Sequence, residues 1–96
     1  MNIIWNPLAL ISYYQIVDYL SKEWNAKVAR DFMQKVENTL EIIKNNPNAF
    51  KSSQKFKNVR RAFINQQNTL FYKINNNEIE LLIFWDNRQD SKRLKY

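Results

Sequence analysis

Side chains able to do chemistry gather in the second half of this chain, and most of them are cationic. Residues 49–96 carry ten basic residues against four acidic ones, whereas residues 1–48 carry five of each, so the whole formal charge of +6 lies in the second half. A positive field confined to one part of a molecule attracts polyanions or an acidic protein partner. The alternative is that these surface cations serve only solubility.

The densest charged cluster directly follows an apolar run. Ile79–Trp85 reads as a buried strand and leads into Asp86–Asp90, which holds two carboxylates and a guanidinium. A rigid strand would hold these groups in place at its end. Arg88 then has two interpretations: a phosphate clamp together with Arg60 and Arg61, or a structural cation neutralised by the flanking aspartates.

Several residue types are missing, and each absence narrows the chemistry. The chain has no Cys, no His and no Gly, which removes thiol nucleophiles, the usual zinc ligands, the commonest general base and any glycine-rich phosphate loop. We expect no metal and no cofactor. Acid–base chemistry would use a shifted Lys73, Asp86 or Asp90, or the phenol of Tyr96. Asn must supply the left-handed turn positions that Gly usually takes.

These groups need a framework, which the hydrophobic pattern predicts. Residues 2–5 form a short strand, Asn6-Pro7 begins a helix with a cap and a first-turn proline, and a second helix opens near Asn25. Three strands follow at Val59–Ile64, Thr69–Ile74 and Glu78–Trp85, joined by Asn-rich turns. The order β-α-α-β-β-β predicts a two-layer α+β fold, a helical hairpin packed on an antiparallel sheet, with the N-terminal strand free to join the sheet edge.

Helical spacing also assigns side chains to the core. In the first helix, the stripe expected to be buried consists of Leu8, Ile11, Tyr14 or Gln15, Val17 or Asp18, and Leu20 to Trp24. We expect core packing for the three tryptophans, which would be base-stacking platforms only if exposed. The second helix has a cleaner seam, made by Ala29, Phe32, Val36, Leu40 and Ile43.

Strand alternation makes equally definite assignments. Arg60 and Arg61 alternate, so one of them faces away from the helices. In the last strand, alternation places Ile79, Leu81, Ile83 and Trp85 on one face and Leu82 and Phe84 on the other.

These segments fall in the order and spacing of a known family. The matching segments are Trp5-Asn6-Pro7-Leu8-Ala9, Asp18-Tyr19-Leu20, Trp24 with Ala29 and Phe32, Pro47 with Phe50, Val59-Arg60-Arg61, Leu70–Ile74 and Trp85–Asp90. Over nearly the full chain, as a single domain of residues 1–96, they resemble the RelE/ParE superfamily of toxins from type II toxin–antitoxin systems.

The resemblance implies one of two activities. One branch of the superfamily cuts messenger RNA on the ribosome, and the other poisons DNA gyrase. The helical hairpin with Asp18-Tyr19-Leu20 resembles the second, ParE-like branch more closely, while Thr69 and Ala62 stand where ribonuclease members often have basic residues. We therefore predict a plasmid-stabilisation-type growth inhibitor, more consistent with a non-enzyme than an enzyme. The alternative is a RelE-like, metal-independent, ribosome-dependent mRNA endonuclease, and a third reading is a degenerate binding module.

The resemblance also implies roles for named residues. If the chain is RelE-like, Arg60, Arg88 and Tyr96 are its catalytic candidates. The residues expected to bind the target or nucleic acid are Arg60, Arg61, Lys73, Arg88, Lys92, Arg93 and Lys95. The last three belong to a basic terminal segment, which is often mobile unless it is docked.

A toxin of this kind implies a cognate antitoxin as partner. We expect an acidic segment with apolar residues, extended or helical, laid across the hairpin and the sheet, contacting exposed apolar positions such as Ile16 and Met33. Without the antitoxin, those positions would allow a homodimer. No apolar run is long enough for a membrane helix, so the expected location is the cytoplasm.

Overall fold

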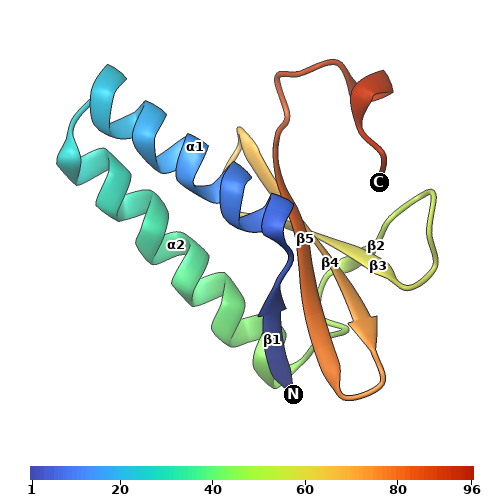
Figure 1. The fold of residues 1–96 in the computed structure, drawn as a ribbon. Coiled ribbons are helices and arrows are strands. Elements are labelled where there is room, and N and C mark those ends of the chain that lie inside the picture. Colours follow the sequence, from blue (N-terminus) through green and yellow to red (C-terminus); the bar gives the residue numbers. More distant parts are fainter.

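The structure, a computed structural model, describes all 96 residues. Its elements are β1 (Asn2–Trp5), α1 (Pro7–Glu23), α2 (Ala26–Asn45), β2 (Lys51–Ser52), β3 (Val59–Phe63), β4 (Asn68–Asn75), β5 (Glu78–Asp86) and a 3-10 turn, η1 (Ser91–Arg93). The two helices form a hairpin on one face of a five-stranded sheet, and the tip of the hairpin projects beyond the sheet (Figure 1). The predicted α+β fold is confirmed.

The sheet adds two details to the prediction. Its strand order is β1-β5-β4-β3-β2, and β1 pairs with β5 in parallel while all other pairs are antiparallel. The N-terminal strand thus joins the edge as expected, but the sheet is mixed. The fifth strand, β2, has only two residues, too few for an alternating pattern to be visible in the sequence.

An asparagine caps the start of each helix. The Asn6 side chain accepts a hydrogen bond from the Leu8 amide at 2.8 Å, and the Asn25 side chain accepts one from the Val28 amide at 2.9 Å. Asn76 is the one residue with a positive φ, 21°, in the turn between β4 and β5. Asn therefore takes the capping and turn roles predicted for it in a chain without glycine.

The main core lies between the hairpin and the sheet. The predicted seam of α2 is confirmed, because Ala29, Phe32, Val36 and Ile43 are buried and Leu40 packs against them. The sheet contributes Ala62, Leu70, Tyr72, Ile79, Leu81 and Phe84 to the same cluster.

The predicted buried stripe of α1 was wrong at its start, whereas Val17 and Leu20 further along pack against the main core. Leu8, Ile11 and Tyr14 are 48%, 54% and 60% exposed, while the buried residues of this helix are Ala9 and Ser12. These small side chains let α1 approach β5 closely: the Ser12 hydroxyl donates to the Ala9 carbonyl at 3.1 Å and accepts from the Phe84 amide at 2.9 Å. A helix that is apolar all round leaves periodicity unable to choose its buried face.

The predicted alternation of β5 was also wrong from its middle onward. Phe71 of β4 lies opposite Ile83, whereas the next residue, Tyr72, lies opposite Leu81, so Leu82 is an extra residue in a β-bulge. Phe84 therefore joins the core under the helices. Leu82 packs with Val59 and Phe71 on the other face, where Ile83 and Trp85 also lie.

The tryptophans divide differently from the prediction. Trp5 is half-buried in the main core, where its ring stacks on Phe84 at 5.6 Å between centroids. Trp85 is half-buried against the smaller cluster on the opposite face. Trp24 ends α1 at the tip of the hairpin and is 68% exposed, so the prediction of core packing was wrong for this residue.

The contact between Ser12 and the bulge gives a stability prediction. Ser12→Ala would leave the buried Phe84 amide without an acceptor, so we expect the free energy of unfolding in urea to fall by about 1–3 kcal/mol. The control is Ser21→Ala on the exposed side of the same helix, expected to change it by less than about 0.5 kcal/mol. Equal losses in both variants would show that the hydroxyl of Ser12 does not support the bulge.

Candidate functional site

A groove of about 940 Å³ opens between the inner side of the hairpin and the end of the sheet. Both helices, the turn between β3 and β4, and the end of β5 contribute to it. Its apolar wall contains Leu8, Ile16, Tyr19, Leu20, Trp24, Val28, Phe32, Ile83, Phe84 and Trp85, and its polar residues include Asp31, Lys35, Asn65, Asp86, Arg88 and Gln89. An apolar hollow with charged groups at its mouth is suited to hold a peptide segment.

The two antitoxin contacts predicted from the sequence lie in different places. Ile16 lines the groove, but it is half-buried against the core instead of exposed. Met33 is 39% exposed and lies outside the groove lining. Sequence reasoning missed Leu8, Tyr19 and Trp24 as surface residues because it assigned apolar side chains of α1 to packing.

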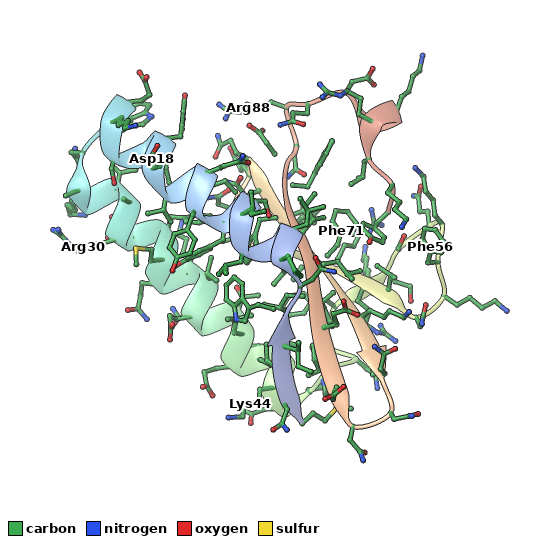
Figure 2. The ribbon with its side chains drawn as sticks, viewed as in Figure 1. Asp18, Arg30, Lys44, Phe56, Phe71 and Arg88 are labelled. Carbon is green, nitrogen blue, oxygen red and sulfur yellow. The ribbon has the colours of Figure 1, made fainter.

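Arg88 stands at the groove mouth, between the end of β5 and α1 (Figure 2). Its guanidinium donates two hydrogen bonds to Asp86, from Nε to Oδ1 at 3.0 Å and from Nη2 to Oδ2 at 2.8 Å. These bonds lower the pKa of Asp86, and Asp86, followed by the Tyr19 hydroxyl, raises the pKa of Arg88. Asp90 is not part of this pair, since its carboxylate caps η1 at the Lys92 amide. The Arg88 side chain remains 60% exposed and available to a ligand.

Arg60 lies elsewhere and is engaged with the backbone. Its Nη1 donates to the Phe50 carbonyl at 2.6 Å, and the neighbouring Tyr72 hydroxyl donates to the Pro47 carbonyl at 2.6 Å. Burial raises the pKa of Tyr72 to about 12 against the opposing effect of the Arg60 charge. Together these side chains hold the loop after α2 on the sheet. Arg60 pairs across the sheet with Tyr72, which pairs with Leu81. Leu81 precedes Asp86 by five residues, or about 16 Å along β5.

Tyr96 lies on the opposite face of the sheet, called here the outer face. Its ring stacks on Phe71 at 6.0 Å and meets the edge of Phe56 at 5.9 Å. Both of these aromatic residues lie across the sheet from Arg88 (Figure 2). The Ser53 hydroxyl donates to the Tyr96 carbonyl at 2.6 Å, so the terminal segment is docked. Arg60, Arg88 and Tyr96 therefore occupy three separate places.

The remaining predicted cations lie mainly toward the outer face. Arg61 shares this face with Phe71 and Ile83, its neighbours across the strands, while Lys73 lies between Val59 and Glu80. The prediction that one arginine of the pair faces away from the helices is confirmed for Arg61. Lys92 and Arg93 form η1, and the Lys95 ammonium lies 5.4 Å from the Tyr96 ring. Lys51, opposite Arg61, was missed because β2 was not predicted.

A helical hairpin on a mixed five-stranded sheet, with a groove beside it and cations on the outer face, defines a small two-layer α+β domain. The sequence matches, over residues 3–91, the family described as the ParE toxin of the type II toxin–antitoxin system, parDE. The chain belongs to this family, within the RelE/ParE superfamily. No curated protein matched in a sequence search.

Solved structures share the fold at low sequence identity. A chain of the chromosomal ParDE system from P. aeruginosa is similar with a TM-score of 0.77 and 15% identity, over 90% of this chain and 95% of that one. The YoeB dimer from Staphylococcus aureus has a TM-score of 0.63 at 18% identity, over 93% and 98%. A heterotetrameric YoeB–YefM toxin–antitoxin complex from the same organism has a TM-score of 0.62 at 17%, over 93% and 98%. In this chain, neither helix is long and apolar enough to cross a membrane.

Proposed function

We propose that this chain is a ParE-like growth inhibitor that acts on DNA gyrase in the cytoplasm without cutting nucleic acid, and that a cognate antitoxin neutralises it. The observation that carries the proposal is the separation of Arg60, Arg88 and Tyr96. The first is bound to backbone carbonyls, the second stands at the groove mouth and the third is stacked on the outer face.

This separation argues against RNA cleavage. Attack by a 2′-hydroxyl needs a general base, donors around the phosphorane and an acid for the leaving oxygen, all within reach of one phosphate. Arg60 is level with Leu81, about 16 Å along the strand from Asp86, the partner of Arg88, and the chain has no His to act as a base. The arrangement favours inhibition by binding.

The groove supports the assignment of the antitoxin site. Leu8 and Trp24 expose 48% and 68% of their surfaces at its wall, and Arg88 adds a cation at its mouth. An amphipathic antitoxin segment would bury its apolar side chains here and direct a carboxylate to Arg88. Without the antitoxin, exposed apolar residues of α1 such as Ile11 and Tyr14 offer a surface for a second copy.

Induced expression separates the two activities. We expect growth arrest, relief of that arrest by the co-expressed antitoxin, and loss of supercoiling by purified gyrase when the toxin is added. Primer extension on messages from arrested cells is expected to show no new cuts inside translated codons. Such cuts together with unimpaired supercoiling would overturn the gyrase assignment in favour of the ribosome-dependent endonuclease, and absence of any toxicity would indicate a degenerate binding module.

A further inference from the structure

We propose that the outer face binds single-stranded nucleic acid at Lys51, Arg61 and Phe63, with the cations on phosphates and the phenyl ring under a base. This goes beyond the proposed function, which assigns a protein target and an antitoxin. It concerns the sheet face opposite the helices and is separate from the groove.

The first observation is an unfavourable charge pair. Lys51 of β2 and Arg61 of β3 lie directly opposite each other in antiparallel strands, so their side chains project from the same face. Like charges at directly opposed positions destabilise a sheet. The row continues through Phe71 to Ile83 and contains no carboxylate. The repulsion between these two cations does not stabilise the fold, whereas an anion bound between them would be attracted to both.

The second observation is that neither Lys51 nor Arg61 forms a salt bridge. The three salt bridges of the protein join Lys22 to Asp18, Lys27 to Asp31 and Arg88 to Asp86, all away from Lys51 and Arg61. On the outer face, Glu80 is opposite Lys73, one row away, and accepts a hydrogen bond from Asn6. Lys55 adds a further cation nearby, with its Nζ on the Leu94 carbonyl at 2.7 Å. The charges of Lys51 and Arg61 are therefore unpaired, which makes the potential over their row positive.

The third observation selects the class of anion. Phe63 is 69% exposed, although it lies within β3. It follows Arg61 by two residues, so both side chains lie on the outer face about 7 Å apart along the strand. The neighbouring residues across the sheet are Thr69, which is buried and bonded to Asn87, and the half-buried Trp85. A flat aromatic ring beside paired cations is suited to base stacking with phosphate contacts.

Single strands fit this surface better than duplexes. Bases of a duplex stack on one another and do not present a free face to an isolated ring. The bases of a single strand are free to stack on Phe63 while the backbone passes Lys51 and Arg61. Binding needs no catalytic group and leaves the strand intact.

Fluorescence anisotropy with a labelled single-stranded oligonucleotide tests the charge contribution. We expect Lys51→Gln/Arg61→Gln to weaken binding and to reduce the slope of log K against log salt by about 1.4, from two lost phosphate contacts. The control, Arg30→Gln/Lys44→Gln, removes the same residue types and the same charge from α2 on the helical side (Figure 2). It is expected to keep the slope within about 0.5 of wild type. Equal reductions in both variants, or no binding by wild type at about 50 mM salt, would overturn the proposal.

A second variant tests the ring. Phe63→Ala is expected to lower affinity for the single strand about tenfold while changing affinity for a duplex of the same length much less. The exposed position of Phe63 and the repulsion at Arg61 predict that neither set of changes lowers the melting temperature. Parallel losses on single strand and duplex would exclude stacking. These assays use purified toxin and naked oligonucleotide, without gyrase. Absence of oligonucleotide binding would therefore overturn this inference without affecting the gyrase proposal, and absence of gyrase inhibition would overturn the gyrase proposal without affecting this inference.

Discussion

Leu8→Glu is expected to weaken antitoxin binding by about 30-fold or more and to prevent rescue of growth by the co-expressed antitoxin. Leu8 lines the groove and is 48% exposed in the free toxin. In the complex its side chain would be buried, so a carboxylate there would have to be desolvated without a partner. The fold should be unaffected, because the position is at the solvent boundary and an acidic group suits the first turn of a helix.

Ile11→Glu provides the matched control. Ile11 is 54% exposed on the same helix, one turn further along, and does not line the groove. The substitution changes the charge by the same amount, yet binding measured by titration calorimetry should remain within about threefold of wild type. If Ile11→Glu abolished binding and Leu8→Glu did not, the antitoxin would occupy the outward side of α1 instead of the groove.

Arg88→Ala is the variant expected to affect toxicity most. Arg88 is 60% exposed and forms its ion pair with a residue only two positions away, so its removal should leave the melting temperature nearly unchanged. Its guanidinium lies at the groove mouth and is held in one orientation by two hydrogen bonds to the carboxylate of Asp86. If it contacts gyrase, the toxin concentration that halves supercoiling should rise about tenfold or more.

Two further variants separate a recognition role from a structural one. Arg88→Lys keeps the charge but loses the two-pronged geometry, so partial activity is expected. Arg30→Ala removes an exposed arginine of α2 that does not line the groove, and it should leave inhibition of supercoiling intact. A large drop in the melting temperature of Arg88→Ala would show instead that this side chain stabilises the end of β5.

The features of the fold that could be predicted are those that depend on residues close together in the sequence. Asn6 and Asn25 mark the helix starts because a side-chain oxygen can satisfy a free amide of the first turn. The bulge at Leu82 was not predictable, since an extra residue is defined only by pairing with β4. The same reason explains β2, which exists only through its partner β3.

The site was less predictable than the fold. Arg88 and Arg61 could be placed on an element and a face from their positions in strands. The groove could not, because it depends on which side of α1 meets the sheet, and small residues such as Ala9 and Ser12 decide that. Apolar spacing alone selected Leu8, Ile11 and Tyr14, which the sheet leaves uncovered.

The lengths of the strands bear on how the free protein behaves in solution. The two long strands, β4 and β5 with eight and nine residues, lie inside the sheet, while its borders are β1 with four residues and β2 with two. Short borders present few unpaired amides and carbonyls, and Lys51 adds a charge to one of them. The free protein should therefore resist fibril growth through the edges of its sheet.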